Sequence, residues 1–168
     1  MTKLSINTPL IKTITAAALG VAAISPAMAD ESPIVVQSTA AMEEWSANAA
    51  RSLDRRLVNA ERLSRVNPVS GIVQVRFELD DDGNPENLDV ISSSGHRSTD
   101  GLAKRAVKGL RDLGDAPVAN AGDQTFQANI IFASNEGEYA KLAYEIEKME
   151  TARLARNDAE GGVISFGL

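Results

Sequence analysis

The stretch "SGIVQVRFELDDDGNPENLDVISSSG", residues 70–95, decides how this chain folds. Its first part, residues 71–79, alternates apolar and polar side chains, which is the pattern of a β-strand buried on one face. An acidic, glycine-containing run follows at 80–84, and residues 86–92 alternate again. Two alternating runs joined by such a turn predict a β-hairpin.

Helical patterns lie on both sides of this hairpin. Upstream, in residues 40–65, apolar side chains recur every three or four positions, as on one face of a helix. They are Met42, Trp45, Ala49, Leu53, Leu57 and Ala60. Downstream, a second helical stripe consists of Leu102, Ala103, Ala106, Val107 and Leu110. We expect Ser98 or Asp100 to cap the start of this second helix, and Gly114 and Pro117 to end it.

The last third of the chain predicts one more strand and one more helix. Residues 125–133 alternate, and a helical repeat covers 136–156. The final residues, "GGVISFGL", are either loose or a short added strand. The order of elements predicts an α+β fold with two layers, in which helices cover one face of a three-stranded antiparallel sheet. We assign the domain to 40–133, the extra C-terminal helix to 134–160 and a tail to 161–168.

The N-terminal segment has the features of an export signal. Lys3 and Lys12 precede a charge-free apolar run, and Ala27-Met28-Ala29 presents small residues for cleavage before Asp30. We therefore predict a secretory signal peptide at 1–29 and a short linker at 30–39. The alternative is an uncleaved anchor, but only thirteen residues separate Lys12 from Pro26, whereas a membrane span takes about 20. Cleavage predicts a periplasmic protein, and retention predicts one anchored in the inner membrane.

Composition excludes several classes of function. The formal net charge is −6, which argues against nucleic acid as a partner, because phosphate backbones reward Lys and Arg. One histidine and no cysteine do not make an ordinary zinc or iron–sulfur site. The run 80–84 lacks the alternating oxygen ligands of a calcium loop. We therefore expect no metal and no cofactor.

A serine, histidine and aspartate group follows the hairpin, which raises the question of catalysis. A nucleophilic serine needs a base and a group to orient it, and His96 is the one histidine in the sequence. No Gly-x-Ser-x-Gly frame surrounds Ser92, Ser93 or Ser94. Adjacent serines between a strand and a helix more often bond the nearby backbone. We expect no enzyme, and a small hydrolase using His96 is the disfavoured alternative.

The third strand is the main candidate for binding. An end strand of a sheet leaves backbone N–H and C=O groups unpaired, and a partner segment can add there as a further strand. A plain, protected edge is an equally good reading of the pattern, and self-pairing into a homodimer is another use of such an edge. The candidate partner-binding residues are Thr125, Phe126, Gln127, Ala128, Asn129, Ile130, Ile131 and Phe132.

Residues 70–133 resemble the C-terminal domain of the TonB family of energy transducers. The resemblance rests on "SGIVQVRFELDDDGNPENLDVISSSGHRSTDGLAKRAVKGL" and, after Pro117, "FQANIIFA". The C-terminal domain of TolA is the nearest competitor. The resemblance implies a periplasmic, non-enzymatic domain that contacts TonB-dependent outer-membrane receptors, which pair an extended segment with the last strand. It also implies that Ser93, Ser94 and Gly95 form a structural signature turn.

The chain departs from the family at several points. Family transducers keep an N-terminal anchor and a long proline-rich spacer, whereas here only the ten residues of the predicted linker, with one proline, separate the predicted signal peptide from the first helix. Thr99 and Lys104 stand where the family usually has apolar residues, and the helix 136–156 lies beyond the usual end of the domain. We therefore expect a periplasmic module that binds a receptor or another envelope protein in receptor-linked transport. The alternative is an anchored TonB energy transducer.

Overall fold

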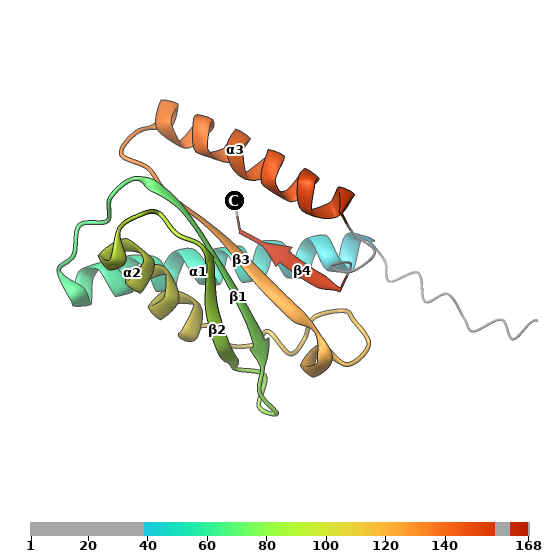
Figure 1. The fold of residues 1–168 in the computed structure, drawn as a ribbon. Helices are drawn as coiled ribbons and strands as arrows, with labels where there is room; N and C mark the ends of the chain where they lie inside the picture. Colours follow the sequence, from blue (N-terminus) through green and yellow to red (C-terminus); the bar gives the residue numbers. More distant parts are fainter. Residues whose placement is uncertain (1–38, 157–161, 168) are drawn as a thin grey trace, which may run out of the picture. The chain divides into compact units, whose positions relative to one another are not determined.

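A computed structural model describes residues 39–156 and 162–167 of the chain, and all of them fall within one compact unit. The predicted signal peptide, 1–29, and all but the last residue of the predicted linker, 30–39, lie outside the described residues. The helices are α1 (Thr39–Ser64), α2 (Arg97–Lys108) and α3 (Glu136–Ala155), with a short 3-10 helix η1 (Ala121–Asp123). The strands are β1 (Gly71–Leu79), β2 (Pro85–Ser92), β3 (Thr125–Phe132) and β4 (Val163–Phe166) (Figure 1).

These strands form one sheet in the order β2-β1-β3-β4. The first three pair antiparallel, and β4 runs parallel to β3. The predicted α+β class and the hairpin are confirmed. The predicted count of three strands is wrong by one, because β4 has only four residues, too few for alternation to distinguish a strand from a loose tail.

One face of the sheet carries the hydrophobic core, which α1 and α2 cover. Val73, Val75 and Phe77 of β1 are at most 1% exposed, and they share this face because strand side chains alternate. The helical stripes predicted from the sequence supply the other side of the core. Their buried members are Trp45, Ala49, Leu53 and Ala60 of α1 and Leu102, Ala103, Ala106 and Val107 of α2.

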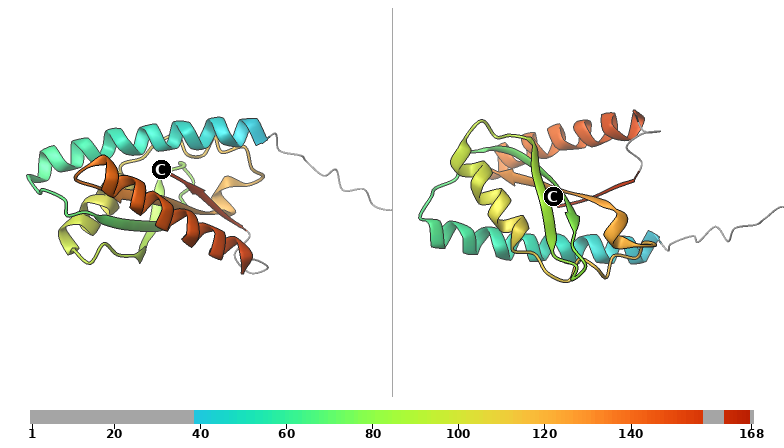
Figure 2. Two further views of the ribbon diagram at one scale, coloured as in Figure 1. Left: turned by 90° about the horizontal axis from the view of Figure 1, so that it is seen from above. Right: turned by 60° about the horizontal axis from the view of Figure 1, so that its bottom comes forward.

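Helix α3 lies on the opposite face of the sheet. The right-hand view in Figure 2 shows α1 and α3 on opposite sides of the strands. Most β1 and β3 side chains on this second face are polar, and they include Gln74, Gln127 and Asn129, all of which are buried. The helices therefore cover both faces of the sheet, with a hydrophobic core of aliphatic and aromatic side chains on one side and mainly polar contacts on the other.

The boundaries of α2 differ from those predicted. The N-cap is His96, and no side chain caps the helix there, so the predicted caps, Ser98 and Asp100, lie inside the helix. The helix ends at Lys108, with Gly109 as its C-cap, five residues before the predicted end at Gly114. The chain leaves helical geometry early because Leu110 and Leu113 both turn into the core, where they are 0% and 2% exposed.

Candidate functional site

The signature turn at Ser93, Ser94 and Gly95 is organised by the carboxylate of Asp100. Asp100 Oδ2 accepts a hydrogen bond from Ser93 Oγ at 2.6 Å, and Oδ1 accepts from Ser94 Oγ at 2.7 Å and from Ser94 N at 2.9 Å. Gly95 has a φ of 82°, a conformation that glycine adopts at little cost. The turn also packs closely on β1, since a Cβ on Gly71 would lie 2.9 Å from Ser94 Cβ.

His96 takes part in this turn through its backbone. Its N–H donates to Ser94 Oγ at 3.3 Å, and its C=O accepts from the same hydroxyl at 3.4 Å. The residue is exposed. Because the serine hydroxyls donate to Asp100, the arrangement fixes the strand-to-helix connection and does not pair a serine with an imidazole base.

Asp100→Ala is expected to lower the free energy of unfolding by about 1–3 kcal/mol, because it leaves the serine donors and the Ser94 amide without their charged acceptor. Partial burial raises the pKa of Asp100, but the hydrogen bonds from Ser93 and Ser94, together with His96, bring that pKa below its usual value. The contribution of the Asp100 carboxylate to the free energy of unfolding is therefore complete above the pKa of Asp100 in the unfolded chain, about 3.9. This contribution is lost as the pH falls through the lower pKa of Asp100 in the folded protein.

Urea denaturation of the wild type and of Asp100→Ala at neutral and acidic pH measures this contribution. Asp115→Ala, which removes an exposed acid, is the control and should change stability by less than about 0.5 kcal/mol. A difference between Asp100→Ala and the wild type that stays the same from pH 7 to well below pH 4 would contradict the assignment.

Over its first half, β3 is not the edge strand of the sheet. Residues 125–128 pair with β4 in parallel register, Thr125 with Val163 and Ala128 with Phe166. The prediction of an open edge is therefore wrong for 125–128, because residues from the predicted tail occupy it. Among the described residues, the pairing of β4 ends at Ala128, and Ile130–Phe132 have no partner in that register.

The side chain of Phe166 anchors β4 to the core. It is 4% exposed and meets Trp45 and Phe77 edge-on, at ring-centroid distances of 5.6 and 6.2 Å. Gly167 follows with a φ of 93°, and a Cβ there would lie 2.3 Å from the backbone oxygen of Asn129. Because any larger residue would collide with β3, glycine permits the chain to approach the strand this closely.

A groove lies beside the uncovered half of β3. It has a volume of about 270 Å³. Apolar side chains from α1, β3 and α3 line it, together with Asp54 and the backbone at Gly167. The apolar members are Leu53, Leu57, Ile130, Ile131 and Tyr139. The groove begins where β4 ends, so a strand continuing along β3 would lie in it.

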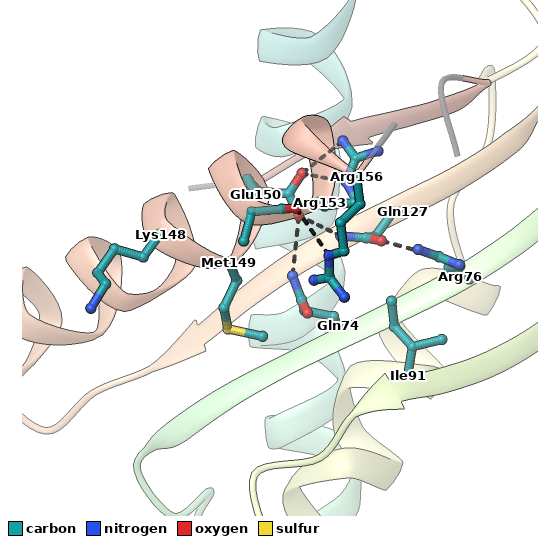
Figure 3. Close-up of a pocket in the computed structure, with 10 residues that line it drawn as sticks. Gln74, Arg76, Ile91, Gln127, Lys148, Met149, Glu150, Arg153 and Arg156 are labelled. Carbon is teal, nitrogen blue, oxygen red and sulfur yellow. Dashed lines mark hydrogen bonds and ion pairs between the residues drawn. The ribbon is translucent and has the colours of Figure 1, made fainter. Parts of the chain in front are cut away.

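On the α3 side of the sheet, a buried polar cluster joins the strands to the helix (Figure 3). Glu150 Oε1 accepts from Gln127 Nε2 at 2.6 Å and from Gln74 Nε2 at 3.2 Å. Both amides also donate to Asn129 Oδ1, at 3.0 and 2.9 Å. Glu150 Oε2 pairs with Arg153 Nη2 at 2.8 Å. Gln127 and Asn129 were predicted as partner-binding residues, but both are buried on this face, beneath α3.

The protein family of this domain follows from a comparison with models of known families. Residues 62–133 match the family described as Gram-negative bacterial TonB protein C-terminal. These residues form a TonB C-terminal domain. Comparisons with curated proteins and with solved structures gave no significant match.

The TonB C-terminal domain accounts for β1, β2, α2 and β3, and for the last residues of α1. Within it lies Thr99, which we expected to depart from the family's apolar residue at this position. Thr99 is fully buried, and its Oγ1 accepts from Val69 N at 2.9 Å. Helix α3 and strand β4 lie after the matched residues, and they contribute Glu150, Arg153 and Phe166.

These last residues were missed by sequence reasoning. An arginine three positions after a glutamate on a helix is usually a solvated pair, and nothing local marks Glu150 and Arg153 as buried. Phe166 lies between a serine and a glycine in a short segment, and nothing in its local sequence indicates that its side chain is buried.

No group of three or more acidic or histidine side chains in 39–156 and 162–167 is arranged to hold a metal ion. None of the helices described for this chain is long and apolar enough to cross a membrane.

Proposed function

We propose that this chain is a periplasmic protein-binding module in receptor-linked transport across the envelope, and that it binds an extended segment of its partner by strand addition to β3, residues Thr125–Phe132. The observation that carries the proposal is the edge of β3, which is occupied only by a strand of four residues in a chain with a TonB C-terminal domain. Such domains take part in envelope transport through contacts with other proteins. The partner proposed is a TonB-dependent outer-membrane receptor or another envelope protein.

The edge itself supports strand addition. Main-chain hydrogen bonds supply affinity in this mode of recognition, and pockets for alternate side chains supply specificity. Residues 125–128 already accept a neighbouring strand in the form of β4, so their donors and acceptors are aligned for pairing. Farther along, the groove lined by Leu53, Leu57 and Tyr139 would receive the apolar side chains of a longer incoming segment.

The partner segment replaces β4 in this proposal. A segment that spans all eight residues of β3 gains about twice the pairing that β4 makes with four. Because β4 competes for the same edge, it lowers the apparent affinity by the fraction of molecules in which the edge is free. The chain thus keeps the edge covered until a partner with a longer strand arrives, which also protects it from unwanted pairing.

Deletion of residues 162–168 tests the proposal, and we expect it to raise the affinity for the partner about tenfold or more. The partner is first captured from detergent-solubilised envelopes with the wild-type protein and identified, and its extended segment is then titrated as a peptide against both proteins. Unchanged or weaker binding after the deletion, or crosslinks that avoid β3, would contradict strand exchange. A crosslink between two copies of β3 would indicate the homodimer instead.

Periplasmic location is part of the same proposal. N-terminal sequencing of the protein recovered in this capture should begin at Asp30, as the signal pattern predicts. A protein that retains Met1 and stays with inner membranes after a salt wash would point to the anchored energy transducer.

A further inference from the structure

A cleft between α1 and the loop after α2 is lined by arginines. It consists of two adjoining cavities of about 220 Å³ each, which share Arg55, Arg111 and Asp112 among their lining residues. The arginines that line this arginine cleft are Arg51, Arg55, Arg56 and Arg111. Asp112 is the acidic side chain among the described lining residues, so positive charge predominates there.

The arginines of the cleft bind neutral groups within their own chain. Arg51 and Arg55 donate hydrogen bonds to side-chain oxygens one turn earlier on α1, and Arg111 Nη1 donates to backbone carbonyl oxygens at the end of α2. Within residues 39–156 and 162–167, no ion pair joins any of the four arginines to a carboxylate. Guanidinium groups are well suited to pair with carboxylates, so the arginine cleft favours an acidic partner.

The turn between β1 and β2 supplies an acidic counterpart. Residues 78–95 contain six acidic residues and no lysine or arginine. Asp80 fixes the turn, because its Oδ1 accepts hydrogen bonds from Asp82 N at 3.0 Å and from Asn84 N at 2.7 Å. Asp81 and Asp82 are exposed, and Figure 1 shows the turn projecting beyond the helices. A turn with a fixed shape binds a partner with little further loss of conformational entropy.

The acidic turn and the arginine cleft adjoin within one molecule. A Cβ on Gly83 would lie 3.4 Å from the backbone of Gly114, which places the turn beside the loop that carries Arg111. The backbone N–H of Asn84 is the main cause that holds the pKa of Asp80 below its usual value, and the positive charge of Arg111 also lowers this pKa. Part of the charge of Arg111 thus acts within its own chain, and the other three arginines are available to a partner.

We propose that the partner of the arginine cleft is a second copy of this chain. A two-fold dimer needs a surface that is complementary to itself, and adjoining acidic and basic patches form such a surface. The turn of each copy enters the cleft of the other, where Asp81 and Asp82 pair with the arginines of α1.

Net charge opposes this association only at long range. Each copy carries a formal net charge of −6, but salt at about 0.15 M limits electrostatic interactions to about 8 Å. The opposite charges that meet in the dimer therefore outweigh the repulsion between the rest of the two copies. The groove beside β3 is lined by other residues of α1 than the arginine cleft, so this proposal does not depend on strand addition.

Sedimentation velocity of the purified protein over a range of concentrations tests the proposal. We expect a dimer that forms as the concentration rises. Raising the salt from about 0.1 M to about 1 M should weaken the dimer about tenfold or more, because the screening length falls from about 10 Å to about 3 Å. A monomer at every concentration would overturn the proposal. A dimer that salt does not weaken would also overturn it and would point to pairing through β3.

Charge-reversal variants identify the contact. Arg55→Glu and Asp81→Arg should each abolish the dimer, because like charges then meet at both contacts between the two copies. An equimolar mixture of the two variants should dimerise again, since every contact then joins opposite charges. Both side chains are exposed, and circular dichroism checks that the variants fold. Arg51→Glu takes the place of Arg55→Glu if that variant does not fold.

Arg97→Glu is the matched control. It reverses the charge of an exposed arginine at the other end of α2, and screening by salt should leave dimerisation within about twofold of the wild type. A mixture of Arg55→Glu and Asp81→Arg that stays monomeric would overturn the proposal. An equal loss of the dimer with Arg97→Glu and with Arg55→Glu would overturn it as well.

Discussion

Replacing Glu150 with alanine is expected to lower the free energy of unfolding by about 3–5 kcal/mol, the range for breaking a buried ion pair from one side. The change leaves the guanidinium of Arg153 buried without its carboxylate and removes the acceptor shared by Gln74 and Gln127. Urea denaturation followed by circular dichroism measures the loss.

Glu147→Ala is the matched control, because it removes an exposed acid from the same helix and should cost less than about 0.5 kcal/mol. The double variant Glu150→Gln, Arg153→Met should be more stable than the sum of the single losses predicts, since it removes both buried charges together. Equal effects of Glu150→Ala and Glu147→Ala would show that the ion pair contributes no more than a surface pair.

Phe166→Ala is expected to release β4 from the edge of β3. Truncation of a buried phenylalanine costs about 3–5 kcal/mol, and four residues of parallel pairing offer β4 little to offset that loss. At about 1.4 kcal/mol for each factor of ten, the docking equilibrium of β4 shifts by about two to three and a half orders of magnitude. Hydrogen exchange of the β3 amides that face β4 should accelerate accordingly, and the affinity for a strand-adding partner should rise.

Ser165→Ala keeps β4 intact and alters the neighbouring side chain, so it is the control and should leave exchange in β3 within about threefold of the wild type. If Phe166→Ala instead unfolded the whole domain, hydrogen exchange would accelerate to the same extent for the backbone amides of β1 and of β3. Slow exchange throughout β3 in the variant would show that backbone pairing alone holds β4 in place.

Much of the fold could be predicted from local pattern. The alternation in 71–79 and 125–133 identified β1 and β3 almost to the residue, because each of these strands presents apolar side chains to one core. The stripe from Met42 to Ala60 identified α1 for the same reason. The turn at Ser93–Gly95 was predicted to be a structural signature of the family, and both of its serines donate hydrogen bonds to Asp100.

The candidate site was harder to predict, because its residues acquire their roles from distant partners. The local sequence around Gln127 and Asn129 is the same whether the face that they share is exposed to solvent or covered by another element. The position of α3 determines that this face is covered. Glu150 and Arg153 have the spacing of a surface pair, and Phe166 lies in a segment too short to show a period.

By itself the sequence determined the α+β class, the hairpin, the two helices of the core and the likeness of 70–133 to a TonB C-terminal domain, since periodicity and turn chemistry are local properties. The tertiary structure alone decided that β4 covers half of β3, and that α3 covers the buried polar side chains of the opposite face of the sheet. Both results depend on contacts between residues more than twenty positions apart, such as Gln127 with Glu150. A contact of that kind is set by the packing of whole elements, which no local pattern contains.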